Sequence, residues 1–499
     1  MKKLIVLLVL LAPLPLVAQI NLPTGNGWHV LSSSSTCGSG PCAGTVLKGG
    51  SQDPGNPSNG QYTDNSQTTT QVYEGSGFTA NLAVWFGAWG GGWADDVNQQ
   101  LCLFGGGHGN SEINFVPCVS LNGANGPTWT TLSAQTIPVP INGNSKDYEC
   151  ADSNNHWVYT SLSSGTNYGS SGSQADVSFN VGPCLTPSAR HVYENVNWIP
   201  DQGYMMMTCC FVMNNAGGTL ETWKLNGATG VWTRDSTCCL VKPDGGQHLS
   251  AYDPTTHKLW SMGTSSAYTY NTTNNTWSGS IAVAMQAAGA IGIDTDNHIL
   301  ITTNTNGTGG NNASWPLTQS SVQLYAYDLN NSNAPINNGS DPLNPLDHDW
   351  NHNNFAGCLG GVAQNSGMQY DTALHLFVVY PGGGNNLMFI NTSLTPVVTA
   401  YGTVPAQGCF QFTLGLVKGT DYPNDPDTVT GAGNCGTNTT CMVGLNGRFG
   451  YFPTENVFVM ANAVDNPVWV LRLAPNPPAN PMSSIVTGGV VVSGGAVIK

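Results

Sequence analysis

Charged side chains are scarce in this chain. Only 8% of its 499 residues are charged, and 13 Lys and Arg stand against 28 Asp and Glu, which gives a formal charge of −15. Nucleic acids and anionic membranes carry negative charge themselves, so a chain with this balance is poorly suited to bind either. We therefore expect no nucleic-acid partner and no membrane insertion.

Helical patterns and long apolar runs are also missing. No stretch repeats its apolar residues with a 3.6-residue period, and Gly and Pro interrupt nearly every window, which excludes a helical fold. One apolar run, from Leu4 to Ala12, follows Met1-Lys2-Lys3. It is too short to span a bilayer, and with the small Ala18 before Gln19 it is typical of a secretory signal peptide. The sequence thus predicts a signal peptide over 1–18 and a soluble protein that is secreted, extracellular or periplasmic.

Cysteine is abundant, but its spacing is not that of a zinc site. The 14 cysteines include no CxxC pair. Disulfides persist in oxidising compartments, so an exported chain favours bridges, with free thiols as the alternative. We expect local bridges, namely Cys37–Cys42, Cys102–Cys118, Cys150–Cys184, Cys358–Cys409 and Cys435–Cys441. The vicinal pairs Cys209-Cys210 and Cys238-Cys239 are expected to be linked to each other.

A short turn recurs between apolar runs along the chain. Tyr252-Asp253-Pro254 opens one copy, and Tyr370-Asp371-Thr372 opens another. The six copies cover residues 94–101, 198–204, 252–259, 293–299, 370–376 and 451–457. Self-similarity of this kind indicates a stacked unit, and a tight Asp/Pro turn between two β-rich runs is a β-hairpin.

A second pair of β segments follows several hairpins, for example 221–225 with 231–233. Four antiparallel strands of this kind make one blade of a β-propeller. Residues 152–158 look like a seventh turn, so we predict seven blades; six remain if that segment is an insertion. Residues 28–31 resemble a fourth strand without a blade, and the last hairpin lacks one, so their pairing would close the ring. The predicted domains are a propeller over 19–474 and a Pro- and Gly-rich tail over 475–499.

The segment 101–108, with Trp129 behind it, resembles a kelch repeat, in which a strand ends in a glycine pair and a Trp marks the fourth strand. The resemblance covers about residues 80 to 474. It implies that the loop after the second strand of a blade and the start of the innermost strand lie on one face. His108, Arg190, His191, His248 and Arg448 would then converge at one mouth of the central channel. Copper radical oxidases share this type of fold, but their Tyr-His pair is absent here.

These five residues are the candidate catalytic or binding residues. Only four arginines occur in the chain, and two of them, Arg190 and Arg448, open innermost strands. A guanidinium there suits a carboxylate, although it can equally cap backbone carbonyls between blades. The histidines suit acid–base chemistry or a metal, but no tight metal-ligand spacing occurs, so a metal site stays open and no cofactor is expected.

Two classes of function fit this pattern. As a binding module, the propeller would hold an extracellular glycan or protein at its channel mouth. As an enzyme, it would cleave a uronate-containing polysaccharide by β-elimination, with Arg190 or Arg448 on the carboxylate and His191 or His108 as base. A purely structural extracellular role is a third alternative. The fold by itself does not decide between them.

Overall fold

The computed structural model describes residues 22, 25–31, 90–105, 116–121, 127, 129–133, 148–151, 157–159, 186–187, 192, 194–208, 210–211, 218–219, 222–235, 249–262, 266–278, 281–282, 290–305, 322–330, 366–380, 386–414, 445, 447–461 and 468–475. Every element in these ranges is a β-strand. No helix within them is long and apolar enough to cross a membrane.

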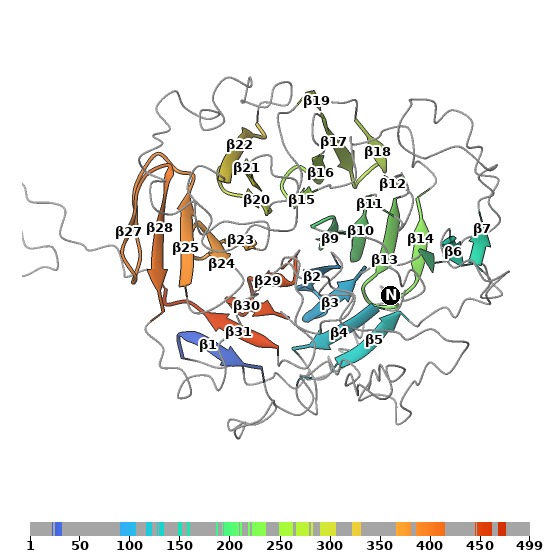
Figure 1. The fold of residues 1–499 in the computed structure, drawn as a ribbon, viewed down its shortest axis with the longest axis horizontal. Coiled ribbons are helices and arrows are strands. Elements are labelled where there is room, and N and C mark those ends of the chain that lie inside the picture. Colours follow the sequence, from blue (N-terminus) through green and yellow to red (C-terminus); the bar gives the residue numbers. More distant parts are fainter. Residues whose placement is uncertain are drawn as a thin grey trace, which may run out of the picture.

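Six antiparallel sheets surround a central axis as the blades of a propeller (Figure 1). Blade 1 is β2 (Gly91–Asp95), β3 (Gln100–Phe104), β4 (Val116–Ser120) and β5 (Trp129–Ser133). Blade 2 is β9 (Val196–Ile199), β10 (Tyr204–Met207), β13 (Trp223–Asn226) and β14 (Trp232–Arg234). Blade 3 is β15 (Leu249–Asp253), β16 (Lys258–Met262), β17 (Ser266–Asn271) and β18 (Thr276–Trp277), with β19 (Ile281–Ala282) also paired to β17.

The other three blades complete the ring. Blade 4 is β20 (Ile291–Asp294), β21 (Ile299–Thr305) and β22 (Val322–Asp328). Blade 5 is β23 (Gly367–Asp371), β24 (Leu376–Tyr380), β25 (Asn386–Asn391) and β28 (Gly408–Thr413). Blade 6 is β29 (Phe449–Phe452), β30 (Val457–Met460), β31 (Trp469–Arg472) and β1 (Gly27–Val30).

Two small hairpins leave the blades. The first is β11 (Cys210–Phe211) with β12 (Gly218–Thr219), between the second and third strands of blade 2. The second is β26 (Val397–Val398) with β27 (Thr403–Val404), between the third and fourth strands of blade 5.

The innermost strands establish that the ring is closed. β2 contacts β9, β9 contacts β15, β15 contacts β20, β20 contacts β23, β23 contacts β29, and β29 contacts β2 again. All six turns predicted from the sequence join the first and second strands of these blades. The all-β propeller is therefore confirmed, with a ring of six blades in the described residues.

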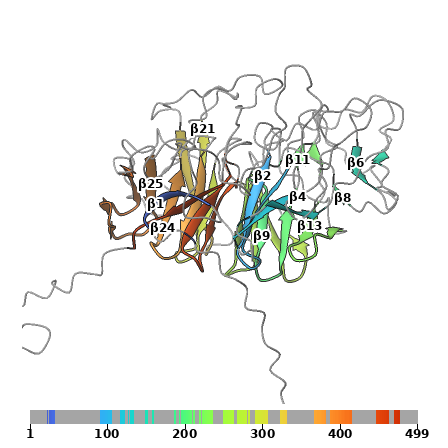
Figure 2. The same ribbon diagram turned by 90° about the horizontal axis from the view of Figure 1, so that it is seen from below.

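The predicted count of seven blades is corrected by a third small sheet, which lies outside the ring. The supposed seventh turn lies between β6 (Tyr148–Ala151) and β7 (Trp157–Tyr159), which pair with β8 (Thr186–Pro187) in the order β7-β6-β8. This sheet lies outside the ring beside blade 2 (Figures 1 and 2), where β8 contacts β14. It is an insertion between blades 1 and 2, as the alternative from the sequence allowed.

The apolar core lies between blades, because each sheet is covered on both faces by its neighbours. Separate buried clusters join blades 1 and 2, 2 and 3, 3 and 4, and 4 and 5, and one large cluster joins blades 5, 6 and 1. Strand β24 shows the consequence in its sequence, Leu-Phe-Val-Val-Tyr, in which every residue is buried. Burial on both faces replaces the usual polar and apolar alternation with a continuous apolar run.

The ring is closed by the N-terminal strand, as predicted. β1 pairs antiparallel with β31, with Trp28 opposite Leu471 and Val30 opposite Trp469. The N–H of Leu31 also donates to the carbonyl of Val468 at 2.8 Å. Trp28 is fully buried and packs its ring edge-on against Tyr380 of blade 5, with the centroids 4.8 Å apart. The first and last described strands of the chain thus share one sheet, with β1 as the outermost strand of blade 6, and this pairing closes the ring.

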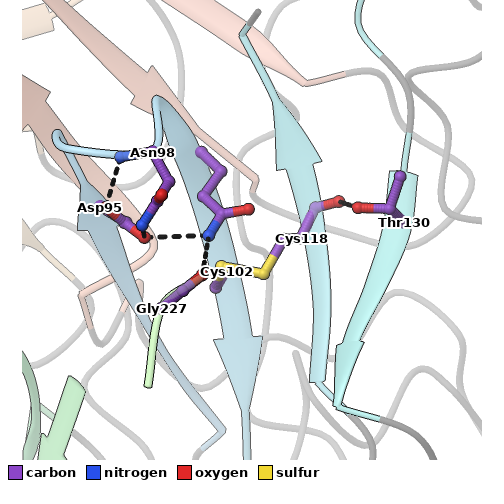
Figure 3. Close-up of a disulfide and its surroundings, with 7 residues drawn as sticks. Asp95, Asn98, Cys102, Cys118, Thr130 and Gly227 are labelled. Atoms are coloured by element: carbon purple, nitrogen blue, oxygen red, sulfur yellow. Dashed lines mark hydrogen bonds between the residues drawn. A yellow bond between two sulfur atoms is a disulfide. The ribbon is translucent and has the colours of Figure 1, made fainter. Parts of the chain in front are cut away.

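A covalent link joins two strands within blade 1. Cys102 and Cys118 are directly opposite each other on β3 and β4 and form a buried disulfide (Figure 3), as expected from the sequence. Cys409 is also disulfide-bonded; its predicted partner Cys358 lies outside the described residues, as do Cys37, Cys42, Cys184, Cys209, Cys238, Cys239, Cys435 and Cys441.

Replacing Trp28 by Ala should weaken the closure. The change removes a fully buried side chain at the seam between blades 5 and 6, so we expect the free energy of unfolding to fall by about 3–5 kcal/mol. Urea denaturation followed by intrinsic fluorescence measures it. Leu394→Ala is the matched control, because Leu394 is 68% exposed and should change the value by less than about 0.5 kcal/mol. Equal effects of the two substitutions would contradict the closure by β1.

Candidate functional site

A cavity of about 280 Å³ lies on the propeller axis, between the six innermost strands. Every blade contributes to its wall, mainly through aromatic, amide, hydroxyl and proline side chains. The lining residues are Gly92, Trp93, Ala94, Asp96, Glu194, Val196, Asn197, Trp198, Pro200, Ser250, Ala251, Tyr252, Pro254, Ile291, Gly292, Ile293, Thr295, Gln369, Tyr370, Thr372, Gly447, Gly450, Tyr451 and Pro453. Pro254, Thr372 and Pro453 are exposed, so the cavity opens at the end of the channel formed by the hairpin turns.

The repeated turn builds this open end. In four blades a buried Asp ends the innermost strand, and its Oδ1 accepts backbone N–H groups two or three residues further on, at 2.8–3.0 Å. These are Asp95, Asp253, Asp294 and Asp371. Figure 3 shows the first of them with Asn98. Such side-chain bonds stabilise a turn before the next strand begins.

The last residue of every turn has a left-handed backbone. The φ values lie between 50° and 67° at Gln99, Gly203, His257, His298, His375 and Asn456. Gly, Asn and His adopt this conformation more readily than most residues, which explains the His, Gly and Asn at this position. The six turns therefore share one geometry, which places the residue after each strand at the rim of the cavity.

Four large aromatic residues occupy the first position of these turns, and we call them the aromatic collar: Trp198, Tyr252, Tyr370 and Tyr451. Each one donates a hydrogen bond to an Asp of the preceding blade. Trp198 Nε1 donates to Asp96 Oδ1 at 2.8 Å, Tyr370 to Asp296 at 2.7 Å, and Tyr451 to Asp371 at 3.1 Å, while Tyr252 donates to Asp201. The collar therefore lines the cavity and joins blade to blade at the same time.

Two turn histidines share these carboxylates. His257 Nδ1 lies 2.9 Å from Asp201, and His375 Nδ1 lies 2.5 Å from Asp296. The side chains of His257 and His375 are 47% and 63% exposed, and each pairs with an Asp of the preceding blade. Although partial burial raises the pKa of each Asp, the hydrogen bonds from Tyr and His lower it below the usual value for both Asp201 and Asp296.

Acid should weaken these contacts. Because the pKa of Asp201 and of Asp296 is lowered on folding, their contribution is present above the unfolded pKa of about 3.9 and is lost as pH falls below it. We expect the variant Asp201→Asn/Asp296→Asn to lose less stability than the unmodified protein between pH 6 and pH 3, measured by urea denaturation. Asp328→Asn is the control, because Asp328 lies in an outer turn, where it accepts the local N–H of Asn330. An unchanged acid sensitivity in the double variant would contradict the assignment.

Glu194 lies at the other end of the cavity, just before β9. Its Oε2 accepts the N–H of Ile291 on blade 4 at 2.8 Å, and its carboxyl also accepts the N–H of Gly447 on blade 6. Its backbone carbonyl accepts the N–H of Ser250 on blade 3 at 2.9 Å. The residue is only 7% exposed, so one side chain reaches across the channel and connects opposite blades.

Burial controls the charge of Glu194. Removal from water raises its pKa to about 8, although the two backbone N–H groups counteract part of that rise. Gly447 can approach because it has no side chain: its φ is +78°, and a Cβ there would lie 2.3 Å from the carbonyl oxygen of Gly92. The carboxyl is thus held in place by backbone contacts and carries its charge only above neutral pH.

The effect of pH on stability through Glu194 should have the opposite sign to the effect through Asp201 and Asp296. A raised pKa means that the contribution of Glu194 is complete below the unfolded value near 4.3 and is lost as pH rises toward 8. We expect Glu194→Gln to flatten the decline in urea midpoint between pH 5 and pH 8. Asp328→Asn should leave that decline unchanged. A decline of equal size in Glu194→Gln would show that Glu194 does not titrate in this range.

Of the five candidate site residues predicted from the sequence, the structure describes Arg448. His108, Arg190, His191 and His248 lie outside the described residues. Arg448 is fully buried, and its Nη1 donates to the carbonyl of Gly90 at 2.6 Å, at the seam between blades 6 and 1. Burial lowers its pKa to about 9. This contact corresponds to the alternative in which an arginine caps a backbone carbonyl between blades.

The sequence interpretation missed Glu194 and the collar. Glu194 offered one signal, an acid directly before an apolar strand in a chain with few charges. The collar was present in the first position of the turn copies, where Trp or Tyr recurs. Among the tryptophans, Trp93 of blade 1 lines the cavity, whereas Trp85, Trp89 and Trp350 lie outside the described residues.

Neither a metal site nor a relative adds to this picture. Within the ranges that the structure describes, no group of three or more His, Cys, Asp or Glu is placed to hold a metal ion. No protein-family model matches the chain, and no curated protein matches it. The class that the fold defines is a six-bladed β-propeller.

Proposed function

We propose that this propeller is exported and binds one end of an extracellular glycan in its central channel. The observation that carries the proposal is the axial cavity, which joins an aromatic collar to amide and hydroxyl groups. Its volume of about 280 Å³ is close to the lower end of the range of roughly 300–1,000 Å³ found for ligand pockets. A site of this size suits a single sugar ring better than the middle of a long chain.

The wall has the two kinds of group that a sugar ring needs. The rings of Tyr252 and Tyr370 offer faces for its C–H surfaces, while Asn197, Ser250 and Gln369 offer hydrogen-bonding groups from three different blades. Asn197 and Gln369 are only partly buried. Because the phenol groups of the collar are already bonded to Asp carboxylates, their rings are oriented before a ligand arrives, which lowers the entropy cost of binding.

Export and family membership are part of the same proposal. The Cys102–Cys118 disulfide is consistent with an oxidising compartment, as is the bonded Cys409. The signal peptide predicted over 1–18 and the kelch-like segments support the same view. An extracellular protein partner is the alternative ligand.

The lyase alternative would use Arg190, His191, His108, His248 and Arg448. The cavity wall as described carries the carboxyls of Glu194 and Asp96, and neither favours a uronate. We therefore place binding ahead of elimination. Ultraviolet absorbance of unsaturated products, with Arg190→Ala and His191→Ala as variants, tests elimination in the same glycan panel.

The test is binding of the purified protein to neutral, cationic and uronate-containing oligosaccharides, measured by glycan array and then by calorimetry. We expect Gln369→Ala and Tyr252→Ala to weaken binding at least tenfold. Tyr252→Phe keeps the ring and should retain most of the affinity. Gln411→Ala is the matched control, because Gln411 is exposed on the outermost strand β28. Absence of binding to every glycan, or equal loss in Gln411→Ala, would overturn the proposal.

A further inference from the structure

The charges around the cavity have one sign among the residues that line it. Glu194 lies at one end and Asp96 near the other, whereas no Lys, Arg or His is among the described lining residues. Arg448 is the nearest cation in sequence to a lining residue, but it is not part of the wall, and its Nη1 is bonded to Gly90. Among the described lining residues, a ligand in this cavity therefore meets two carboxyl groups and no positive side chain.

The aromatic collar strengthens the same preference. A ring face attracts a cation through its quadrupole, and the effect is larger where water is excluded. All four collar residues donate a hydrogen bond to a carboxylate, which pushes electron density toward the ring. Trp198, Tyr370 and Tyr451 are each less than 10% exposed, so these rings are largely shielded from water. The cavity thus combines electron-rich ring faces with the carboxyl of Glu194 at the end opposite the hairpin turns.

We propose that the sugar entering the channel is an amino sugar whose free, protonated amine lies between the aromatic collar and the carboxyl of Glu194. This inference rests on the proposed function, since it specifies which glycan the same cavity takes. Gln369, together with Asn197, whose Nδ2 donates to Ser250 Oγ, then faces the hydroxyl groups of the sugar. An N-acetylated sugar lacks the charge, and a uronate has the wrong one.

Binding of a cation is then coupled to proton release. Glu194 must ionise to pair with the amine, and its pKa of about 8 means that it does so at the expense of a proton near neutral pH. The other ionisable groups on the strands around Glu194 are Asp95, Asp96, Tyr252, Asp253, Asp294, Tyr370, Asp371, Arg448 and Tyr451. Burial raises the pKa of each of these tyrosines and lowers that of Arg448 to about 9. Burial also raises the pKa of Asp95 and Asp371, so the Glu194→Gln variant assigns a transition between pH 6 and pH 8 to Glu194.

The experiment compares tetrasaccharides that differ only at nitrogen: the glucosamine tetramer, its N-acetylated form and its N-trimethylated form. Tetramethylammonium and a uronate tetramer complete the panel. Calorimetry with the full protein should show that the free-amine and trimethylated tetramers bind at least tenfold tighter than the N-acetylated one. For the trimethylated tetramer, whose charge does not change with pH, affinity should rise between pH 6 and pH 8. The binding enthalpy measured in two buffers of different ionisation enthalpy should differ, because Glu194 releases a proton to the buffer when the ligand binds.

Glu194→Gln should remove most of the preference for the cation and its pH dependence, while Asp328→Asn should change neither. If Glu194→Gln does not fold, the proton release of the unmodified protein decides. Equal binding of amine and N-acetyl tetramers, or tighter binding of the uronate, overturns the amino-sugar inference and leaves glycan binding intact. Binding of tetramethylammonium alone overturns the glycan and keeps the cation site. Absence of any binding overturns both.

Discussion

The hydrogen bond between a turn carboxylate of one blade and an aromatic or histidine side chain of the next is the contact on which the centre of this propeller depends. A ring of sheets has least room at its axis, where the innermost strands of the six blades converge. These strands are β2, β9, β15, β20, β23 and β29. An exposed ion pair contributes little to stability alone. Repeated around the axis beside buried apolar clusters, the same contacts determine how each turn is oriented against its neighbour. The collar that lines the cavity is therefore a by-product of the way in which the blades are joined.

Local features of the fold could be predicted from the sequence because they leave local signals. The Asp that ends an inner strand is present in four of the six copies, and the residue with the left-handed backbone ends every one; all six copies form hairpins. The pairing of residues 28–31 with the last blade was predictable for a different reason: one segment lacked a blade, and one blade lacked a strand. The count of seven was wrong because residues 152–158 carry the same local signal as residues 293–299. A turn sequence specifies a hairpin, but only contacts with neighbouring blades specify a place in the ring.

The candidate site was less accessible to sequence reasoning because its chemistry is non-local. The carboxyl of Glu194 is held by the N–H groups of Ile291 and Gly447, which lie on other blades and carry no side-chain signal at all. Because arginine is rare in the chain, the sequence favoured the arginines as site residues instead. Arg448 donates a hydrogen bond to the carbonyl of Gly90 at a seam between blades. A rare residue marks a constrained position. It does not say whether the constraint is a ligand or a neighbouring blade.

The carboxyl of Glu194 is the physical basis of the proposal that the channel takes a positively charged ligand. A Gln of the same length could accept the N–H of Ile291 without titrating, but its NH2 group, itself a donor, could not accept the N–H of Gly447 as the second carboxyl oxygen can. Keeping an acid there costs stability as pH rises toward 8, because the buried carboxyl resists ionisation while the unfolded chain ionises freely. A cation in the cavity reverses that balance, since it stabilises the ionised form in a site with little water. Besides accepting two backbone N–H groups, Glu194 can become negative when a positive group arrives, which an amide cannot do.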